Sequence, residues 1–367
     1  MRLSYLALKI FSAKGGIEQV NKNWLFALHQ ISKNEKFSYK VYSMYDDKHE
    51  EQYIRERLFN AFHKNKFLFT VKSIWGSINS DIVIVSHLNL AVFALIAKLM
   101  NPRIKIIIQL HGIESWRVLT GTQELLLEKA DHILAVSKYT ANIMTAKYPK
   151  HQQKIKVFNN SLDPFIEQSI NTSNIARNLA RKQLTIPSER FVLITIGRLD
   201  SSESYKGYDK TLEALSMIKD LDFLFYIIGK YDPKEEQRVK TLIENYQLTE
   251  KVMLKGLVVD DELANYYRSA DVFIMPSKGE GFGLVFIDAM AHGLRVIGGN
   301  ADGSVDAISA FKDSFLVDPN NTVDIKNAIQ NIIDSNWTEN NRAALSKHCV
   351  ELFSANKFQR QVERLFL

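Results

Sequence analysis

The chain has 367 residues, which predicts two domains of about 100–200 residues each rather than a single domain. Hydrophobic residues make up 46% and charged residues 24%, a composition that excludes a disordered chain and predicts well-filled cores. Cys349 is the only cysteine, which excludes a disulfide scaffold.

The net charge of +6 is unevenly distributed along the chain. Residues 1–165 hold 23 Lys+Arg and 13 Asp+Glu, a net of +10, whereas the remaining 202 residues hold 24 and 28, a net of −4. A basic half predicts an acidic partner such as nucleic acid, an anionic membrane or a phosphorylated substrate. The alternative is an ordinary scatter of solvated surface charge.

No segment has the pattern of a membrane span or a signal peptide. The best apolar run, Leu88 to Met100, has 13 residues, against the roughly 20 that a spanning helix needs. The apolar stretch after Arg2 ends at Lys9, and no small-residue cleavage site follows it. We therefore expect a cytoplasmic protein.

Strand-like and helix-like segments alternate along the chain. Short β-branched runs predict buried parallel strands, at residues 81–85, 103–108, 132–136, 154–157, 191–196, 223–228 and 271–275. Amphipathic patterns between them predict helices, at residues 17–31, 88–100, 121–130, 138–148, 208–219, 234–246, 260–269, 283–292 and 322–335. This order predicts an α/β fold.

The chain is expected to divide near residues 160–185, because residues 159–173 are rich in Asn, Ser and Thr and a new series of strands begins at Phe191. We predict a first Rossmann-like domain over residues 1–165 and a second over 166–345. In such sheets ligands bind at the carboxyl ends of the strands, so the loops there should carry the chemistry.

A glycine pair, Gly15 and Gly16, lies between the first strand and the first helix. Such a pair lets backbone N–H groups approach an anion at the helix N-terminus. The alternative is a tight strand-to-helix turn with no ligand.

Arg198 follows the strand at 191–196, and Lys206 comes eight residues later. Arginine offers a bidentate fork and lysine a point charge, so the two can converge on a diphosphate. The alternative is two surface cations on a loop.

The most specific motif is the glycine-rich turn and helix at residues 276–293. Glu280 lies in the turn, and Asp288 lies about a turn and a half into the helix. Gly281 and Gly283 leave backbone N–H groups open to a ligand. The two acids could bind hydroxyls of a sugar and a ribose, with phosphates at the helix N-terminus between them. Alternatively, Asp288 is an acid favoured by the helix dipole.

Two histidines follow predicted strands: His87 after residues 81–85, and His111 after residues 103–108. At a strand end, histidine is a candidate hydrogen-bond donor or acid. The alternative for each is a structural role.

Together these motifs resemble the retaining glycosyltransferases of family 4, and the resemblance covers nearly the whole chain. It implies the GT-B architecture, two Rossmann-like domains facing across a cleft, with a last helix, here residues 346–367, that returns to the first domain. The family has two acids separated by seven residues, which match Glu280 and Asp288, the second being Asp in place of Glu. Residues 300–306 lack the Pro-Glu pair of many members and resemble a subset in surface polysaccharide assembly.

The resemblance implies a role for each motif. Arg198 and Lys206 would clamp the donor diphosphate, Glu280 would hold sugar hydroxyls, Asp288 the ribose, and His111 would lie near the reacting carbon. The implied catalytic residues are His111, Glu280, Arg198 and Lys206. The implied donor-binding residues are Gly15, Gly16, Arg198, Lys206, Gly256, Val258, Glu280, Gly281, Phe282, Gly283, Leu284 and Asp288.

The implied reaction is hexosyl transfer, with retention, from a UDP- or GDP-sugar to a glycan or a polyprenyl-diphosphate-linked acceptor. We expect no cofactor and no metal, since the two cations can balance the diphosphate. Asp220 and Asp222 precede their strand, the wrong end for a donor-site metal. The alternatives are a GT-B sugar phosphorylase and a non-catalytic nucleotide-sugar binder. No nucleic-acid-binding signature is present.

Residues 50–75 place Ile54, Leu58 and Phe62 at helical spacing among basic residues, with further Phe and Trp. A basic amphipathic helix of this kind can lie on an anionic membrane. The protein would then sit peripherally on the inner face of the cytoplasmic membrane. The alternative is a helix packed on the sheet of the first domain.

Overall fold

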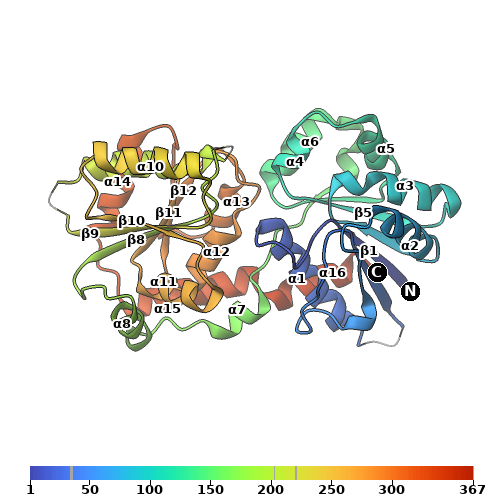
Figure 1. Ribbon diagram of the computed structural model, residues 1–367, viewed down its shortest axis with the longest axis horizontal. Coiled ribbons are helices and arrows are strands. Elements are labelled where there is room, and N and C mark those ends of the chain that lie inside the picture. Colours follow the sequence, from blue (N-terminus) through green and yellow to red (C-terminus); the bar gives the residue numbers. More distant parts are fainter. Residues whose placement is uncertain (34–35, 202, 220, 367) are drawn as a thin grey trace. The chain divides into compact units, whose positions relative to one another are not determined.

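The computed structural model describes residues 1–33, 36–201, 203–219 and 221–366, which form two compact units (Figure 1). Unit 1 is Met1–Ile166 with Phe353–Leu367, and unit 2 is Glu167–Leu352. The last segment was expected to start at residue 346. Instead, α15 (Glu339–Phe353) runs unbroken through that position, so unit 2 extends to Leu352.

In the described part of unit 1, seven parallel strands form one sheet in the order β3-β2-β1-β4-β5-β6-β7. The strands are β1 (Arg2–Ala7), β2 (Ser38–Ser43), β3 (Phe59–Ala61), β4 (Ile82–Val85), β5 (Lys105–Leu110), β6 (His132–Ala135) and β7 (Ile155–Val157). The strand order reverses at β1, next to β4, and ligands of such sheets bind outside a switch point of this kind.

Helices cover both faces of this sheet (Figure 1). They are α1 (Gly16–Ile31), α2 (Lys66–Ile78), α3 (Ala91–Met100), α4 (Ile113–Trp116), α5 (Gly121–Lys129) and α6 (Lys138–Lys147), with α7 (Pro164–Ser169) spanning the boundary between the units. The last helix, α16 (Ala355–Arg364), packs on α1. The ring of Trp24 lies 5.6 Å from that of Phe358 and 5.4 Å from that of Phe158, so aromatic contacts hold the chain's end to unit 1.

The helix expected within residues 50–75 is wrong in its position. Glu56–Leu58 is a short 3-10 turn, β3 follows it, and α2 begins only at Lys66. Ile54 and Phe62 are both buried in the body of unit 1, so they form no membrane-facing stripe. The Asn65 side chain caps α2 by accepting a hydrogen bond from the backbone N–H of Leu68.

In the described part of unit 2, six parallel strands form one sheet in the order β10-β9-β8-β11-β12-β13. They are β8 (Phe191–Ile196), β9 (Phe223–Ile228), β10 (Val252–Gly256), β11 (Val272–Met275), β12 (Arg295–Gly299) and β13 (Phe315–Val317). β8 and β11 are neighbours at the switch point, so the loops that follow them meet at one edge of the sheet.

The helices of unit 2 besides α15 are α8 (Asn174–Gln183), α9 (Tyr208–Ser216), α10 (Pro233–Asn245), α11 (Asp260–Ser269), α12 (Leu284–Ala291), α13 (Ser304–Ile308) and α14 (Thr322–Ile333). Local sequence explains several of their starts. For example, Asp232 caps α10 through the backbone N–H of Glu235 at 2.8 Å, and Pro233 occupies the first turn. Within the described residues of both units, the helices are too short or too polar to cross a bilayer.

Candidate functional site

The loops after β8 and β11 bring together the acid and the cation that the motifs singled out. The Nζ atom of Lys206 lies 2.7 Å from Oε1 of Glu280, and both side chains are mostly buried. Burial, the largest single cause, acts to lower the pKa of Lys206, but Glu280, Tyr205 and Glu203 together outweigh it, so the pKa lies above its usual value. Lys206 is therefore a fixed cation.

A second acid, Glu203, joins the two cations of this loop. It forms an ion pair with Arg198, and its Oε2 atom lies 3.7 Å from Nζ of Lys206. The side chain of Arg198 is 63% exposed, whereas that of Glu203 is mostly buried. Ion pairs thus link Arg198, Glu203, Lys206 and Glu280 in that order. The sequence motifs did not single out Glu203.

The close approach of the two loops depends on a glycine. Gly207 has φ of +76°, and a Cβ atom there would lie 2.2 Å from the backbone oxygen of Pro276. Any larger residue would strain the backbone and separate the loops. Gly207 therefore keeps Lys206 within reach of Glu280.

The turn that carries Glu280 is fixed by a buried carboxylate, Asp302, whose side chain is 1% exposed. Its Oδ2 atom accepts hydrogen bonds from the backbone N–H of Glu280 at 2.7 Å and from the hydroxyl of Ser277 at 2.8 Å. Its Oδ1 atom accepts from the backbone N–H of Ser304 at 2.9 Å. Burial raises the pKa of Asp302, although these hydrogen bonds act to lower it.

Asp302 lies in residues 300–306, which stood out in the sequence only because they lack the Pro-Glu pair of many members of the resembling family. The same stretch contacts the turn a second time, because the backbone N–H of Gly303 donates to the carbonyl of Glu280 at 2.8 Å. A Cβ atom at Gly303 would lie 2.0 Å from the carbonyl oxygen of Gly281, so glycine is required there. Residues 300–306 thus support the candidate site.

The helix that follows the turn, α12, begins at Gly283 without a side-chain cap, which leaves its N-terminus suited to an anion. Asp288 lies half-buried in the middle of α12. Burial, with the carboxylate of Asp288 as a further cause, raises the pKa of Tyr267 and of Cys349. Asp288 therefore lies on the helix that begins at the site, close to Tyr267 of α11 and Cys349 of α15.

The remaining predicted donor residues of unit 2 lie at the same edge of the sheet. Phe282 is buried, and Gly281 and Leu284 are half-buried around the start of α12. Gly256 ends the edge strand β10 with φ of +66°, and Val258 follows it. These two therefore lie two strands away from β8.

In unit 1, His111 and His87 lie at the ends of the neighbouring strands β5 and β4. The Nε2 atom of His111 lies 2.7 Å from the carbonyl oxygen of Ser86, and its backbone N–H donates to Glu114. Burial lowers the pKa of His87, and the nearby charges of His111 and Arg117 add to this, while Glu114 opposes it. Each ring is oriented by a local hydrogen bond, since Nδ1 of His87 accepts from the backbone N–H of Asn89.

The glycine pair lies where the sequence places it, at the start of α1. Gly15 is extended, with φ of −174°, and precedes the first turn without a side-chain cap. A Cβ atom at Gly16 would meet only open space, so packing inside unit 1 does not require glycine there. A close approach by a ligand would explain its presence.

The loop before this pair is organised by Asp46, which is fully buried. Its carboxylate accepts hydrogen bonds from the backbone N–H groups of Ile10 at 2.7 Å and Ser12 at 2.7 Å, and from the hydroxyl of Ser43 at 2.6 Å. Asp46 therefore fixes a loop of unit 1 by accepting hydrogen bonds from its backbone, as Asp302 fixes the turn in unit 2. Neither acid was part of a sequence motif.

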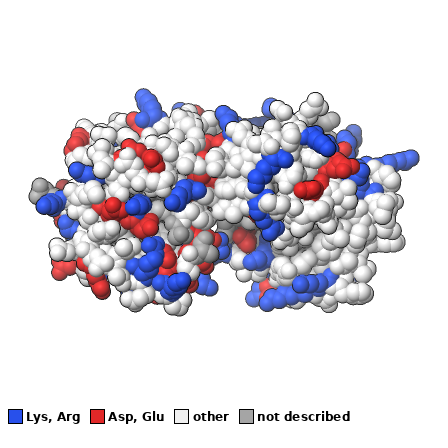
Figure 2. All heavy atoms as spheres, turned by 90° about the horizontal axis from the view of Figure 1, so that it is seen from above, with Lys and Arg blue, Asp and Glu red and all other residues white. Residues whose placement is uncertain are grey.

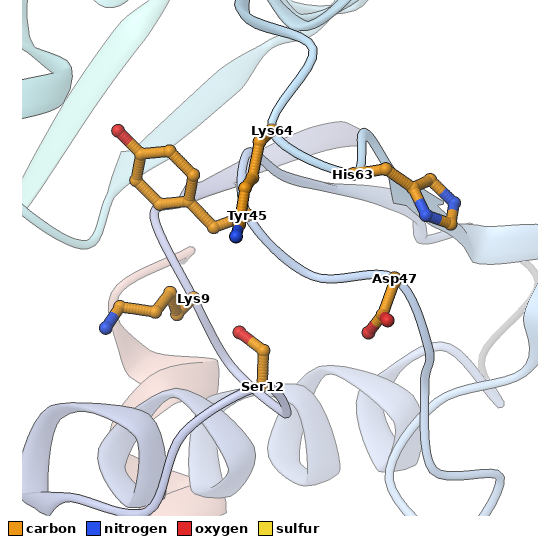
Figure 3. A pocket seen from close by; sticks show the side chains of 6 residues that line it. All are labelled: Lys9, Ser12, Tyr45, Asp47, His63 and Lys64. Carbon is orange, nitrogen blue, oxygen red and sulfur yellow. The ribbon is translucent and has the colours of Figure 1, made fainter.

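A hollow of about 640 Å³ opens at the carboxyl ends of β1, β2 and β3 (Figure 3). Its lining comes from three successive loops: Lys9, Ser12, Tyr45, Asp47, His63 and Lys64. His63 and Lys64 both have positive φ, 48° and 68°, a conformation that costs side-chain-bearing residues energy. Strain of this kind gathers at functional sites, so the hollow is a candidate binding site of unit 1.

No group of three or more His, Cys, Asp or Glu within the described ranges could hold a metal ion. Of the predicted Asp pair, Asp220 lies outside the described residues. Asp222 directly precedes β9 and pairs with Arg190 at 2.9 Å.

Two family models match the chain: one described as Glycosyltransferase Family 4 over residues 15–164, and one described as Glycosyl transferases group 1 over residues 176–348. The D-inositol 3-phosphate glycosyltransferase of Paenarthrobacter aurescens is 26% identical over 235 residues, 63% of this chain and 56% of that protein. An uncharacterized 41.2 kDa protein in the cps region of Klebsiella pneumoniae is 30% identical over 179 residues, 48% of this chain and 44% of that protein. The matched part thus spans about half the length of these relatives.

Among solved structures, Anabaena Alr3699/HepE in complex with UDP and glucose has a TM-score of 0.80 at 18% identity. The match covers 100% of this chain and 99% of that chain, and shows that the fold is shared. The fold shared with this structure is the GT-B architecture, built from two Rossmann-like units. The chain is thus similar to glycosyltransferase family 4 over most of its first unit and to glycosyl transferases group 1 over most of its second.

Proposed function

We propose that the protein transfers a hexosyl group, with retention of the anomeric configuration, from a UDP- or GDP-sugar to a glycan or polyprenyl-diphosphate-linked acceptor. The observation that carries the proposal is the arrangement of Arg198, Lys206 and Glu280 at the switch point of unit 2. Lys206 contacts Glu280 in the turn that leads into α12, Arg198 is linked to Lys206 through Glu203, and the N-terminus of α12 has no side-chain cap. This arrangement suits a diphosphate followed by a sugar.

In the proposed reaction, the bond between the anomeric carbon and the diphosphate oxygen breaks, and the acceptor oxygen bonds to that carbon from the same face. The acceptor proton passes to the departing diphosphate. Arg198 and Lys206 stabilise the charge that develops on the leaving group, and they do the work of a metal cation there. Glu280 accepts hydrogen bonds from sugar hydroxyls, Asp288 binds the ribose, and no further cofactor takes part.

We assign the acceptor to the hollow of unit 1, where Lys9 and Lys64 can meet an acidic group. Gly16 lies on α1, which follows the loop that supplies Lys9 and Ser12. We also propose that the product enters surface polysaccharide. The relative in the cps region and the form of residues 300–306 support that assignment.

The proposal predicts that one nucleotide stabilises the protein in a thermal-shift panel of UDP, GDP and their sugars. A ligand at about 100 times its Kd adds about 2.7 kcal/mol to the free energy of unfolding, because it binds only the folded state. No response to any nucleotide would contradict the proposal. Release of a sugar phosphate on addition of inorganic phosphate would instead identify a phosphorylase.

The assignment of the acceptor to the hollow makes a second prediction, independent of the nucleotide panel. Lys64→Ala and Lys9→Ala should each raise KM for a phosphate-bearing acceptor by at least about tenfold, since a charged hydrogen bond contributes about 1.5–3 kcal/mol. The thermal shift caused by the nucleotide should stay unchanged, because these residues lie in unit 1. Lys33→Ala is the control, a lysine of unit 1 outside the lining of the hollow. An unchanged KM in both variants would remove the hollow as the acceptor site.

A further inference from the structure

The outer side of α2 is apolar where a solvated helix should be polar. Phe67 is 78% exposed and Trp75 is 69% exposed, with Leu68 and Val71 also exposed beside them. The inner side is already occupied, because Phe69 is fully buried against the core of unit 1. The helix therefore has a second apolar side that packs on nothing within the described chain.

The neighbouring helix α3 extends this surface. α2 and α3 pack side by side (Figure 1), and the exposed residues of α3 are also apolar. Their spacing is helical on both: residues 67, 71 and 75 on one, and 92, 96 and 100 on the other. We call the α2–α3 face the set Phe67, Leu68, Val71, Trp75, Val92, Ile96, Leu99 and Met100, all exposed.

The chain that builds this face carries mostly positive charge. Residues 57–113 contain seven Lys+Arg and a single acid, Asp81. Lys64, Lys66 and Lys72 are exposed on α2 and the turn that leads into it. On the side of the molecule drawn in Figure 2, unit 1 carries blue basic side chains together with a group of red acidic ones. A basic rim around aromatic residues is complementary to an anionic lipid surface.

We infer that the α2–α3 face docks unit 1 on an anionic membrane surface. Phe67 and Trp75 would enter the headgroup region, where aromatic residues are favoured, and the lysines would meet the lipid charges. A second copy of the chain fits less well, because a symmetric contact would set the same lysines against one another. The inference deepens the proposed function, since a lipid-linked acceptor would be presented at that surface.

The test is flotation of the full chain with vesicles of neutral phosphatidylcholine, alone or mixed with anionic phosphatidylglycerol, at low salt. We expect binding to the anionic vesicles alone and its loss in high salt, because salt screens the attraction. Phe67→Ser with Trp75→Ser should reduce binding at least tenfold. Lys66→Glu with Lys72→Glu should reduce it by at least about fivefold per lysine.

The matched control is Ile175→Ser, an equally exposed apolar residue on α8 of unit 2, which should bind like the unchanged protein. All four substituted residues of the α2–α3 face and its rim are exposed, so the fold should persist, and thermal unfolding checks this. No vesicle binding, or equal binding by the aromatic double variant, overturns the inference. So does a dimer in sedimentation that Trp75→Ser abolishes, which assigns the face to a second copy.

The nucleotide thermal shift separates this inference from the proposed function. A protein that binds vesicles but no nucleotide keeps the docking face and loses the transferase assignment. A protein that responds to a nucleotide but fails to bind vesicles keeps the transferase assignment and loses the docking face.

Discussion

Replacement of Lys206 by methionine is expected to lower kcat by about 10²–10³-fold, the usual cost of losing one preorganised group that stabilises transition-state charge. Methionine retains the apolar stem, which is mostly buried, and removes only the charge. The carboxylates of Glu280 and Glu203 then lose their shared cation, and the departing diphosphate loses one of its two positive partners. Nucleotide release from the donor selected by thermal shift measures the effect.

Lys210→Met is the matched control for this prediction. Lys210 lies four residues further on, in α9, and pairs with Glu213 at 2.8 Å on a part-exposed surface. A surface pair of this kind contributes about 0–1 kcal/mol, so turnover should stay near normal. Glu280→Gln should reproduce the loss seen at Lys206, since the two act at one site. Near-normal turnover of Lys206→Met would remove its assigned role.

The strands of unit 2 show what local sequence could predict. Residues 191–196 and 223–228 are apolar runs, broken only by Thr195 in the first, and β8 and β9 have those bounds. β12 was not predicted, because Arg295 begins it and Gly298 and Gly299 end it, which hides its β-branched centre. β13 has only three residues and gives no periodicity to detect.

The misplaced helix in residues 50–75 has a different cause. Ile54, Leu58 and Phe62 have helical spacing, but they do not lie on one helix. Ile54 and Phe62 are buried, and Leu58 lies in the 3-10 turn between them. Periodicity cannot tell one helix from two loop residues that are buried on either side of a turn and a short strand. The exposed aromatic residues of α2 were in the same stretch, but their exposure depends on which side of α2 the sheet covers.

The residues of the candidate site also fall into two groups, those that local sequence predicts and those that it does not. Arg198, Lys206 and Glu280 could be predicted because their motifs are local and chemically distinctive. Asp302 and Asp46 could not, because each acts by accepting hydrogen bonds from backbone N–H groups of distant loops. Such contacts exist only after folding, and any acid in the sequence could make them.

For that reason the second large effect is expected at Asp302. Its two oxygens accept from three donors, and an amide has only one acceptor oxygen, so Asp302→Asn sets an NH₂ group against a donor. A buried donor left unpaired costs about 1–3 kcal/mol, and the turn must move to relieve it. Because a displacement of about 1 Å at a positioned group can cost about 10²-fold, we expect kcat to fall by about that factor.

Asp302 acts as a positioning residue through Glu280, and this makes the result specific. The variant should still be stabilised by the nucleoside diphosphate alone, because Arg198 and Lys206 remain in place. It should lose the extra stabilisation that the sugar adds, because the backbone of Glu280 is no longer held. Ser277→Ala is the control, since it removes one donor and leaves the bond from Glu280 intact. Equal loss of both responses would show that Asp302 only supports the fold, and normal turnover would show that the turn does not depend on it.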